Sequence, residues 1–371
     1  MIYFDSAATT FQKPAAVRDA MARAMATMSS PGRGNYPAAQ TAAETAFECR
    51  SELAELFHAE SPEQVVFTSN ATHGLNIAIK TLVKPGSHVV ISGYEHNAVT
   101  RPLSAIPNVR VTVAASPLFR QEEALSAFER AISPDVDTVI CNHVSNVFGC
   151  VLPLEGIAAL CASRGVPLIV DASQSAGVLP IDLLALQAAF IVMPGHKGLY
   201  GPQGTGVLLC NHSVTPLMEG GTGSLSVQQE MPDFLPDRLE AGTHNMPGIA
   251  GLLEGVRFVR SRSPEVICQH ERELAQAAAV AMRHIPGIRV FAEPDLRNQV
   301  GVLSFLVANQ DVEAVGEALA NGGIAVRAGF HCAPLAHQTA GTLQSGTVRL
   351  SFSAFNSKQE ISRFLQLLRT I

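Results

Sequence analysis

The chain has 371 residues, of which 47% are hydrophobic and 16% charged, and its formal net charge is −6. This length exceeds what one hydrophobic core usually serves, so we expect one large and one smaller domain. A negative net charge argues against nucleic acid as a partner, and no apolar run reaches the length of a membrane span. The first residues lack the features of a signal peptide, so we expect a cytoplasmic protein.

The seven cysteines are odd in number and form no C-x-x-C pair. Zinc clusters and a disulfide framework are therefore both unexpected, and no metal site is predicted. Most of these cysteines lie in apolar segments, where they behave as small core residues. Cys332 differs, because it follows a strand and has polar neighbours.

Short apolar runs alternate with stretches of helical periodicity through the first 260 residues, which predicts an α/β domain. The chain opens with a short strand and turn at 1–10. The remaining strands are expected at 65–68, 88–92, 111–113, 138–144, 168–170 and 190–193, and helices at 13–28, 39–58, 121–132, 154–164 and 247–262.

A small polar loop, S-N-A-T-H-G, joins the strand at 65–68 to a helical run. A strand, such a loop and a helix N-terminus together form an anion site, because free N–H groups and the positive end of the helix dipole face the ligand. We therefore expect Ala71 and Thr72 to bind a phosphate. A plain N-cap is the alternative, since Asn and Thr are also capping residues.

The strands at 168–170 and 190–193 are expected to deliver Asp171 and Lys197 to the same sheet edge. A carboxylate and a lysine held together there suit pyridoxal 5′-phosphate (PLP). The carboxylate keeps the pyridine nitrogen protonated and the lysine forms a Schiff base with the aldehyde. The alternative is an aspartate that caps a helix and a lysine on a solvated loop.

The pattern changes near residue 265, where helices mix with a few strands, as in an α+β lid domain. Arg349 stands inside an apolar strand, where it needs either a substrate carboxylate or an internal ion pair. Cys332 is flanked by His331 and Arg327, and nearby positive charge favours the reactive thiolate. Helices are expected at 265–284, 311–321 and 357–369, and strands at 288–291, 301–307, 324–327 and 347–352.

Several strings resemble one family along nearly the whole chain: D-A-S-Q-S-A-G, G-H-K, G-P-x-G-x-G, V-S-N-x-x-G and R-x-E-A-G-T-x-N. They are similar to fold-type I PLP enzymes of the class V aminotransferase branch, and best to cysteine desulfurases and selenocysteine lyases. The resemblance implies a large domain (1–260) with a mostly parallel seven-stranded sheet and a small domain (261–371). Residues 1–15 are expected to pack with the small domain.

The resemblance also assigns roles at the cofactor. Lys197 would form the Schiff base, Asp171 would pair with the pyridinium, and Gln174 would bond the ring's phenolic oxygen. Pro194 departs from the family pattern, because it replaces a serine that donates to the phosphate. His196 would contact the phosphate, His96 would stack on the ring and relay protons, Asn146 would contact cofactor and substrate, and Thr243 would reach the phosphate of the partner in a homodimer.

The resemblance implies conversion of cysteine to alanine, with the sulfur held on Cys332 as a persulfide for an acceptor protein. Arg349 and Arg327 would bind substrate, and Arg33 resembles an arginine that reaches the neighbouring subunit's site. A solvated loop residue is the alternative for Arg33. Selenocysteine lyase, other class V reactions and a non-catalytic homologue remain open, and the sequence does not separate cysteine from selenocysteine.

Overall fold

The computed structural model describes residues 1–32, 34–294 and 297–371. Its larger part is built on a seven-stranded sheet in the order β2-β8-β7-β6-β5-β3-β4. Neighbouring strands run parallel, except that β8 is antiparallel to β2 and β7. The predicted α/β class with a mostly parallel seven-stranded sheet is thus confirmed. The strands are β2 (Val65–Thr68), β3 (His88–Ser92), β4 (Arg110–Ala114), β5 (Thr138–Asn142), β6 (Leu168–Asp171), β7 (Phe190–Pro194) and β8 (Gly206–Cys210).

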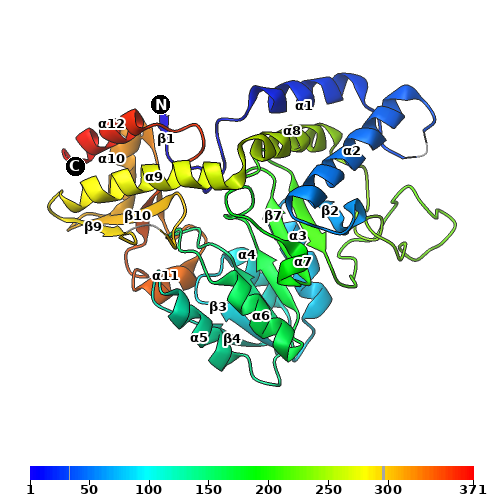
Figure 1. The fold of residues 1–371 in the computed structure, drawn as a ribbon, viewed down its shortest axis with the longest axis horizontal. Helices are drawn as coiled ribbons and strands as arrows, with labels where there is room; N and C mark the ends of the chain where they lie inside the picture. The colour runs from blue at the N-terminus through cyan, green and yellow to red at the C-terminus, as the bar shows by residue number, and fades with distance from the viewer. Residues whose placement is uncertain (33, 295–296) are drawn as a thin grey trace.

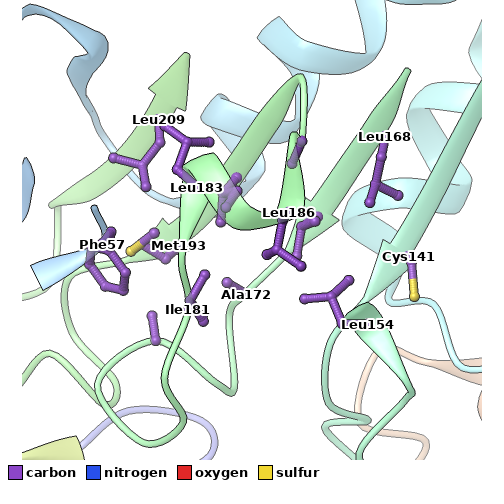
Figure 2. Close-up of a cluster of buried hydrophobic side chains, with 14 of the residues drawn as sticks. Phe57, Cys141, Leu154, Leu168, Ala172, Ile181, Leu183, Leu186, Met193 and Leu209 are labelled. Carbon is purple, nitrogen blue, oxygen red and sulfur yellow. The ribbon is translucent and has the colours of Figure 1, made fainter. Parts of the chain in front are cut away.

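Helices cover both faces of this sheet, because successive strand residues point to opposite sides. Val139 and Cys141 join a core cluster with α2, α5, α6, α7 and α8, whereas Ile140 packs with α3 and α4. Figure 2 shows part of the first cluster, with Met193 beside Phe57 and with Leu186 of α7 between Met193 and Leu168 in this view. The helices are α1 (Ala15–Thr27), α2 (Pro37–Leu56), α3 (Ala71–Leu82), α4 (Asn97–Ala105), α5 (Gln121–Ala131), α6 (Leu154–Arg164), α7 (Leu183–Leu186) and α8 (Met246–Arg262).

The C-terminal part has its own apolar core around an antiparallel sheet of order β12-β13-β10-β9. Among the described helices, none combines the length and the apolar composition needed to cross a bilayer. The strands are β9 (Ile288–Phe291), β10 (Val302–Val307), β12 (Arg327–Gly329) and β13 (Thr347–Ser351), and the helices are α9 (Pro264–Arg283), α10 (Val312–Asn321), α11 (Pro334–Ala340) and α12 (Lys358–Leu368).

The N-terminal segment lies against this C-terminal part, and both chain ends lie at the same end of the molecule (Figure 1). Strand β1 (Ile2–Tyr3) pairs in parallel with β11 (Ile324–Ala325). The prediction of one strand over 324–327 is therefore wrong: β11 and β12 belong to different sheets, and the chain changes partner between them. The sequence reading also missed α4, α7, α11 and β8.

Glu271 of α9 is a buried carboxyl group between the two parts of the chain. It is 6% exposed, and the Tyr200 hydroxyl donates to its Oε1 at 3.5 Å. Burial raises the pKa of Glu271 to about 8 from an ordinary value of 4.5. The folded protein therefore holds a proton that the unfolded chain releases above about pH 4.5. Its stabilising effect is complete below that pH and is lost as the pH rises through about 8.

We therefore expect Glu271 to make the free energy of unfolding fall by about 1.4 kcal/mol per pH unit in that window. Glu271→Gln should remove this contribution from the slope, because glutamine carries no titrating proton. Denaturant unfolding at several pH values between 5 and 8.5 measures this slope. Glu273→Gln, on the exposed side of the same helix, is the matched control. An unchanged slope in Glu271→Gln would contradict the expectation.

Candidate active site

A cavity of about 210 Å³ opens at the carboxyl ends of β5 and β6, beside the turn that follows β7 and the N-terminus of α3. Parallel strands direct their carboxyl ends to one edge, and α/β proteins place their ligands there. The structure brings eight of the nine predicted cofactor residues to this cavity. They are Ala71, Thr72, His96, Asn146, Asp171, Gln174, His196 and Lys197.

Asp171 and Lys197 reach the cavity from neighbouring strands. Asp171 ends β6 and lies opposite Val192 of β7, and its Oδ1 accepts a hydrogen bond from the Ser173 amide at 2.9 Å. Lys197 follows β7 by three residues. Burial lowers the pKa of Lys197 to about 8, while Asp171 opposes that shift and Arg349 adds to it. The Lys197 amine is therefore neutral at mildly alkaline pH, the form that attacks an aldehyde.

The N-terminus of α3 presents free backbone donors to the same cavity. The Asn70 side chain caps the helix by accepting from the His73 amide at 2.9 Å. Within the described residues, the amides of Ala71 and Thr72 donate to no protein acceptor. The N-cap that the sequence left as an alternative is thus present at Asn70. It leaves two N–H groups and the helix dipole available to an anion.

His96 is a neutral acceptor at one side of the cavity. It caps α4, and its Nδ1 accepts a hydrogen bond from the Ala98 amide at 3.0 Å. Burial lowers its pKa, with Asp171 opposing and Lys197 adding to the shift. Nδ1 therefore carries no proton, and the ring's N–H lies at Nε2.

Two of the three remaining predicted residues form side-chain hydrogen bonds within the protein. Gln174 donates to the Ala7 carbonyl at 3.0 Å, and Asn146 donates to the His331 carbonyl at 2.7 Å. Asn146 Oδ1 and His196 Nδ1 are buried without a partner among the described residues. Burial lowers the pKa of His196 to about 4, so this ring is neutral. Both unpartnered atoms need a bonding group, and a ligand in the cavity could supply it.

Glu95 is a buried residue beside the cavity that the sequence reading did not single out. Ser92 Oγ lies 2.6 Å from Glu95 Oε1 and 2.7 Å from Asn142 Oδ1, and Asn142 Nδ2 donates to the Tyr94 carbonyl. One hydroxyl proton cannot satisfy two acceptor oxygens, so a proton on Glu95 completes the network. Burial accordingly raises the pKa of Glu95 to about 8. Neutral Glu95 therefore adds no negative charge beside Asp171 at these strand ends.

Arg349 pairs internally, which is one of the two alternatives that the sequence left open. Its Nη2 donates to Asp5 Oδ1 at 2.9 Å and its Nη1 to the Asn146 carbonyl at 2.9 Å. Arg327 donates to Asp5 Oδ2 at 2.8 Å. Asp5 is thus a second residue that the sequence reading missed. The feature of the sequence that could have indicated Asp5 is an isolated acidic residue between Phe4 and a run of small residues.

Cys332 lies on a turn in which consecutive non-glycine residues have positive φ, 51° at His331 and 55° at Cys332. Such conformations cost free energy and persist where the surroundings impose them. The Cys332 carbonyl accepts from the Asn97 amide at 2.8 Å, which fixes the turn next to His96. The thiol is exposed, whereas the other six cysteines are buried.

His331 does not supply the positive charge expected beside Cys332. Its Nε2 lies 3.1 Å from the Thr347 carbonyl, and burial lowers its pKa to about 2. The ring is therefore neutral and turned into the protein, so this expectation was wrong. Arg327, half exposed, remains a positive neighbour whose charge interacts with Cys332.

Thr243 lies outside this cavity, in a separate hollow of about 160 Å³ with Thr68 and Gly204. Its side chain is exposed. Arg33 lies outside the described residues. Pro194 lines the Lys197 cavity at the position where the family pattern has serine.

Comparisons with known proteins agree on one family. The model of the family "Aminotransferase class-V" matches residues 2–364. A probable cysteine desulfurase of Methanothermobacter thermautotrophicus is 31% identical across 100% of this chain and 94% of its own. Probable cysteine desulfurases of Mycolicibacterium paratuberculosis (34% identical) and Mycobacterium leprae (32%) also match the whole chain, which spans only 55% and 62% of their lengths.

Solved structures give the same result. An apo cysteine desulfurase from Thermococcus onnurineus superimposes with a TM-score of 0.91 at 28% identity, covering 100% of this chain and 94% of the other. The cysteine desulfurase CsdA from Escherichia coli gives a TM-score of 0.88 at 28% identity, covering 99% and 94%. The chain therefore belongs to the class V aminotransferase family and, within it, to the cysteine desulfurase family.

Proposed function

We propose that the protein is a PLP-dependent cysteine desulfurase that converts L-cysteine to L-alanine and takes the sulfur onto Cys332. The observation that carries the proposal is the meeting of Asp171, Lys197 and the α3 N-terminus at one cavity. Family membership supports the same reaction.

The residues at the cavity fit PLP. Lys197 would hold it covalently, Asp171 would keep the ring nitrogen protonated, and the Ala71 and Thr72 amides would bind its phosphate. The unpartnered His196 Nδ1 fits a contact with the same ligand. When bound, PLP supplies an electron sink for the bond changes at the substrate's carbon atoms.

The charge balance at the small-domain strands suits a substrate carboxylate. Arg349 and Arg327 share the single carboxylate of Asp5, which leaves one positive charge in excess. The amino acid's α-carboxylate would balance it, and Asn146 Nδ2 would donate its second N–H to the same carboxylate. The neutral Lys197 amine, once free, would take the proton from Cα at its Nζ.

The sulfur step falls to Cys332. Its thiolate attacks the substrate's sulfur, so that an S–S bond forms as the Cβ–S bond breaks. The electron pair of the broken bond stays with carbon, which takes up a proton to give alanine. The products are alanine and a Cys332 persulfide, with no external oxidant or reductant. An exposed Cys332 would present this sulfur to an acceptor protein.

Incubation of the purified protein and PLP with L-cysteine tests the reaction. We expect alanine in a one-to-one ratio with sulfide when a thiol reductant regenerates Cys332. A parallel incubation with selenocysteine compares the two substrates. If alanine forms from selenocysteine but not from cysteine, the protein is a selenocysteine lyase instead. If neither amino acid yields alanine, the proposal is overturned.

We further propose a homodimer in which Thr243 serves the partner's site. Thr243 lies away from the Lys197 cavity of its own chain, near a segment (218–234) with exposed apolar side chains. Val227 in that segment is 96% exposed, which suits burial against a second copy.

Mixed dimers test this arrangement. A Lys197→Ala subunit paired with a Thr243→Ala subunit should regain one intact site per heterodimer, so activity should exceed the sum of the two homodimers. Lys197→Ala paired with Thr72→Ala is the control, because both residues serve the same chain's site and no intact site can form. Equal behaviour of the two mixtures would show that Thr243 does not act in trans.

A further inference from the structure

The carbonyl oxygen of His196 is contacted by four donors from one short N-terminal stretch. They are the Thr10 amide at 3.0 Å, Thr10 Oγ1 at 3.0 Å, Thr9 Oγ1 at 3.3 Å and Lys13 Nζ at 3.1 Å. A carbonyl oxygen has two lone pairs, so this one is saturated with donors. Thr10 Oγ1 also lies 3.3 Å from the Lys197 carbonyl, so its single proton is shared between the two carbonyls, while the Thr10 amide donates to His196 in either case. The N-terminal stretch therefore forms hydrogen bonds with the peptide groups on both sides of the Lys197 α-carbon.

Lys13 is an unusual partner for a backbone carbonyl. Within the described residues it contacts no carboxylate, and its Nζ bonds only Thr10 Oγ1 and the His196 carbonyl. Burial lowers its pKa to about 8. An ammonium withdrawn from water without a counter-ion is costly unless hydrogen bonds compensate it. Below about pH 8 the Lys13 amine is charged, and its position is tied to the His196 carbonyl because a charged donor makes the stronger type of hydrogen bond.

The same stretch is held at its other end by the small domain. Asp5 binds both Arg349 and Arg327, and β1 pairs with β11. Eight residues along the chain, Lys13 holds the peptide that joins His196 to Lys197. If Lys13 no longer held the His196 carbonyl, the peptide between His196 and Lys197 could move, and the Lys197 side chain would move with it.

We propose that Lys13 is a positioning residue for Lys197, and that together with Thr10 it clamps the His196 carbonyl so that the Lys197 amine is held at a fixed place in the cavity. The inference rests on the proposed function, because it gives Lys197 the role of cofactor-binding amine. Lys13 itself contacts neither cofactor nor substrate in this arrangement and acts through the main chain.

The test compares Lys13→Met, which keeps the length of the side chain but removes its donors, with Lys13→Arg, which keeps a charged donor. Lys358→Met, on an exposed helical position, is the control. The first readout is the rate at which the apoprotein takes up PLP into the form that borohydride traps. The second is the division of any loss between kcat and KM for cysteine.

We expect Lys13→Met to slow PLP capture and to lower kcat by up to about 100-fold, the loss that misplacing a reacting group by about an ångström can cause. KM should stay within about threefold, because the substrate arginines are untouched. Lys13→Arg should recover most of both losses, and Lys358→Met should match the wild type. If Lys13→Met does not fold, Thr10→Val removes the hydroxyl of the clamp at nearly constant volume and should show the same two losses.

Folded Lys13→Met or Thr10→Val with wild-type capture rate and kcat would overturn the clamp while leaving the proposed function intact. A loss that Lys13→Arg fails to recover would also overturn it, since any charged donor should serve. A wild-type protein that never forms a borohydride-trapped PLP adduct would instead refute the proposed function itself.

Discussion

Replacing Lys197 by alanine should abolish covalent attachment of PLP and reduce cysteine turnover by about a thousandfold or more, equivalent to about 4 kcal/mol in the barrier. The variant loses the amine that both holds the cofactor and takes the Cα proton. Its neighbours Asp171 and the α3 N-terminus are unchanged, so PLP can still bind without the covalent link. Absorbance of the bound cofactor, borohydride reduction and mass spectrometry of the Lys197 peptide measure the loss.

The matched control is Lys358→Ala, since Lys358 is 73% exposed and lies on α12. It should keep the absorbance of the bound cofactor, the borohydride-trapped adduct and full turnover. Lys197→Ala should also unfold at a temperature no lower than the wild-type apoprotein, because the removed amine pairs with no carboxylate in the described residues. A trapped adduct that survives in Lys197→Ala would assign the covalent link to another lysine.

The parts of this site that the sequence could predict are local in the chain. An apolar run such as that at 168–170 is typical of a buried strand, and the residue that follows it, Asp171, then reaches the sheet edge. Asp171 and Lys197 could therefore be paired from the order of residues alone. The turn at Asn70 likewise follows from a strand, a capping residue and a helix within ten residues.

The contacts of this site that the sequence could not predict join distant segments of the chain. Asp5 and Arg349 are 344 residues apart, and neither local sequence contains a pattern that indicates its partner. His331 was expected to lend its charge to Cys332, but its ring direction depends on Thr347 and on the packing of His337. The hydrogen bond from Lys13 to the His196 carbonyl likewise joins segments that are distant in the chain. Side-chain direction and long-range pairing are set by tertiary packing, which periodicity does not encode.

Cys332→Ala is the second change for which we expect a large effect, and it separates a nucleophilic from a structural cysteine. A cysteine that only packs behaves as a small apolar residue, and alanine would replace it at a modest cost in stability. Cys332 is exposed on a turn with positive φ, so it contributes little packing. Its removal should therefore leave the unfolding temperature nearly unchanged and leave PLP bound through Lys197.

Alanine release from L-cysteine, however, should fall by several kcal/mol in barrier, about a thousandfold, because no thiolate remains to accept the sulfur. Cys161→Ala, at a buried position in α6, is the control and should keep full turnover. Mass spectrometry after alkylation should find the additional sulfur on the Cys332 peptide of the wild type. With selenocysteine as substrate, turnover in Cys332→Ala should fall much less, because selenium leaves more readily and needs the thiol less. Unchanged turnover of cysteine in Cys332→Ala would mean that sulfur leaves without this residue, and the persulfide step proposed above would be wrong even if Lys197 and PLP act as expected.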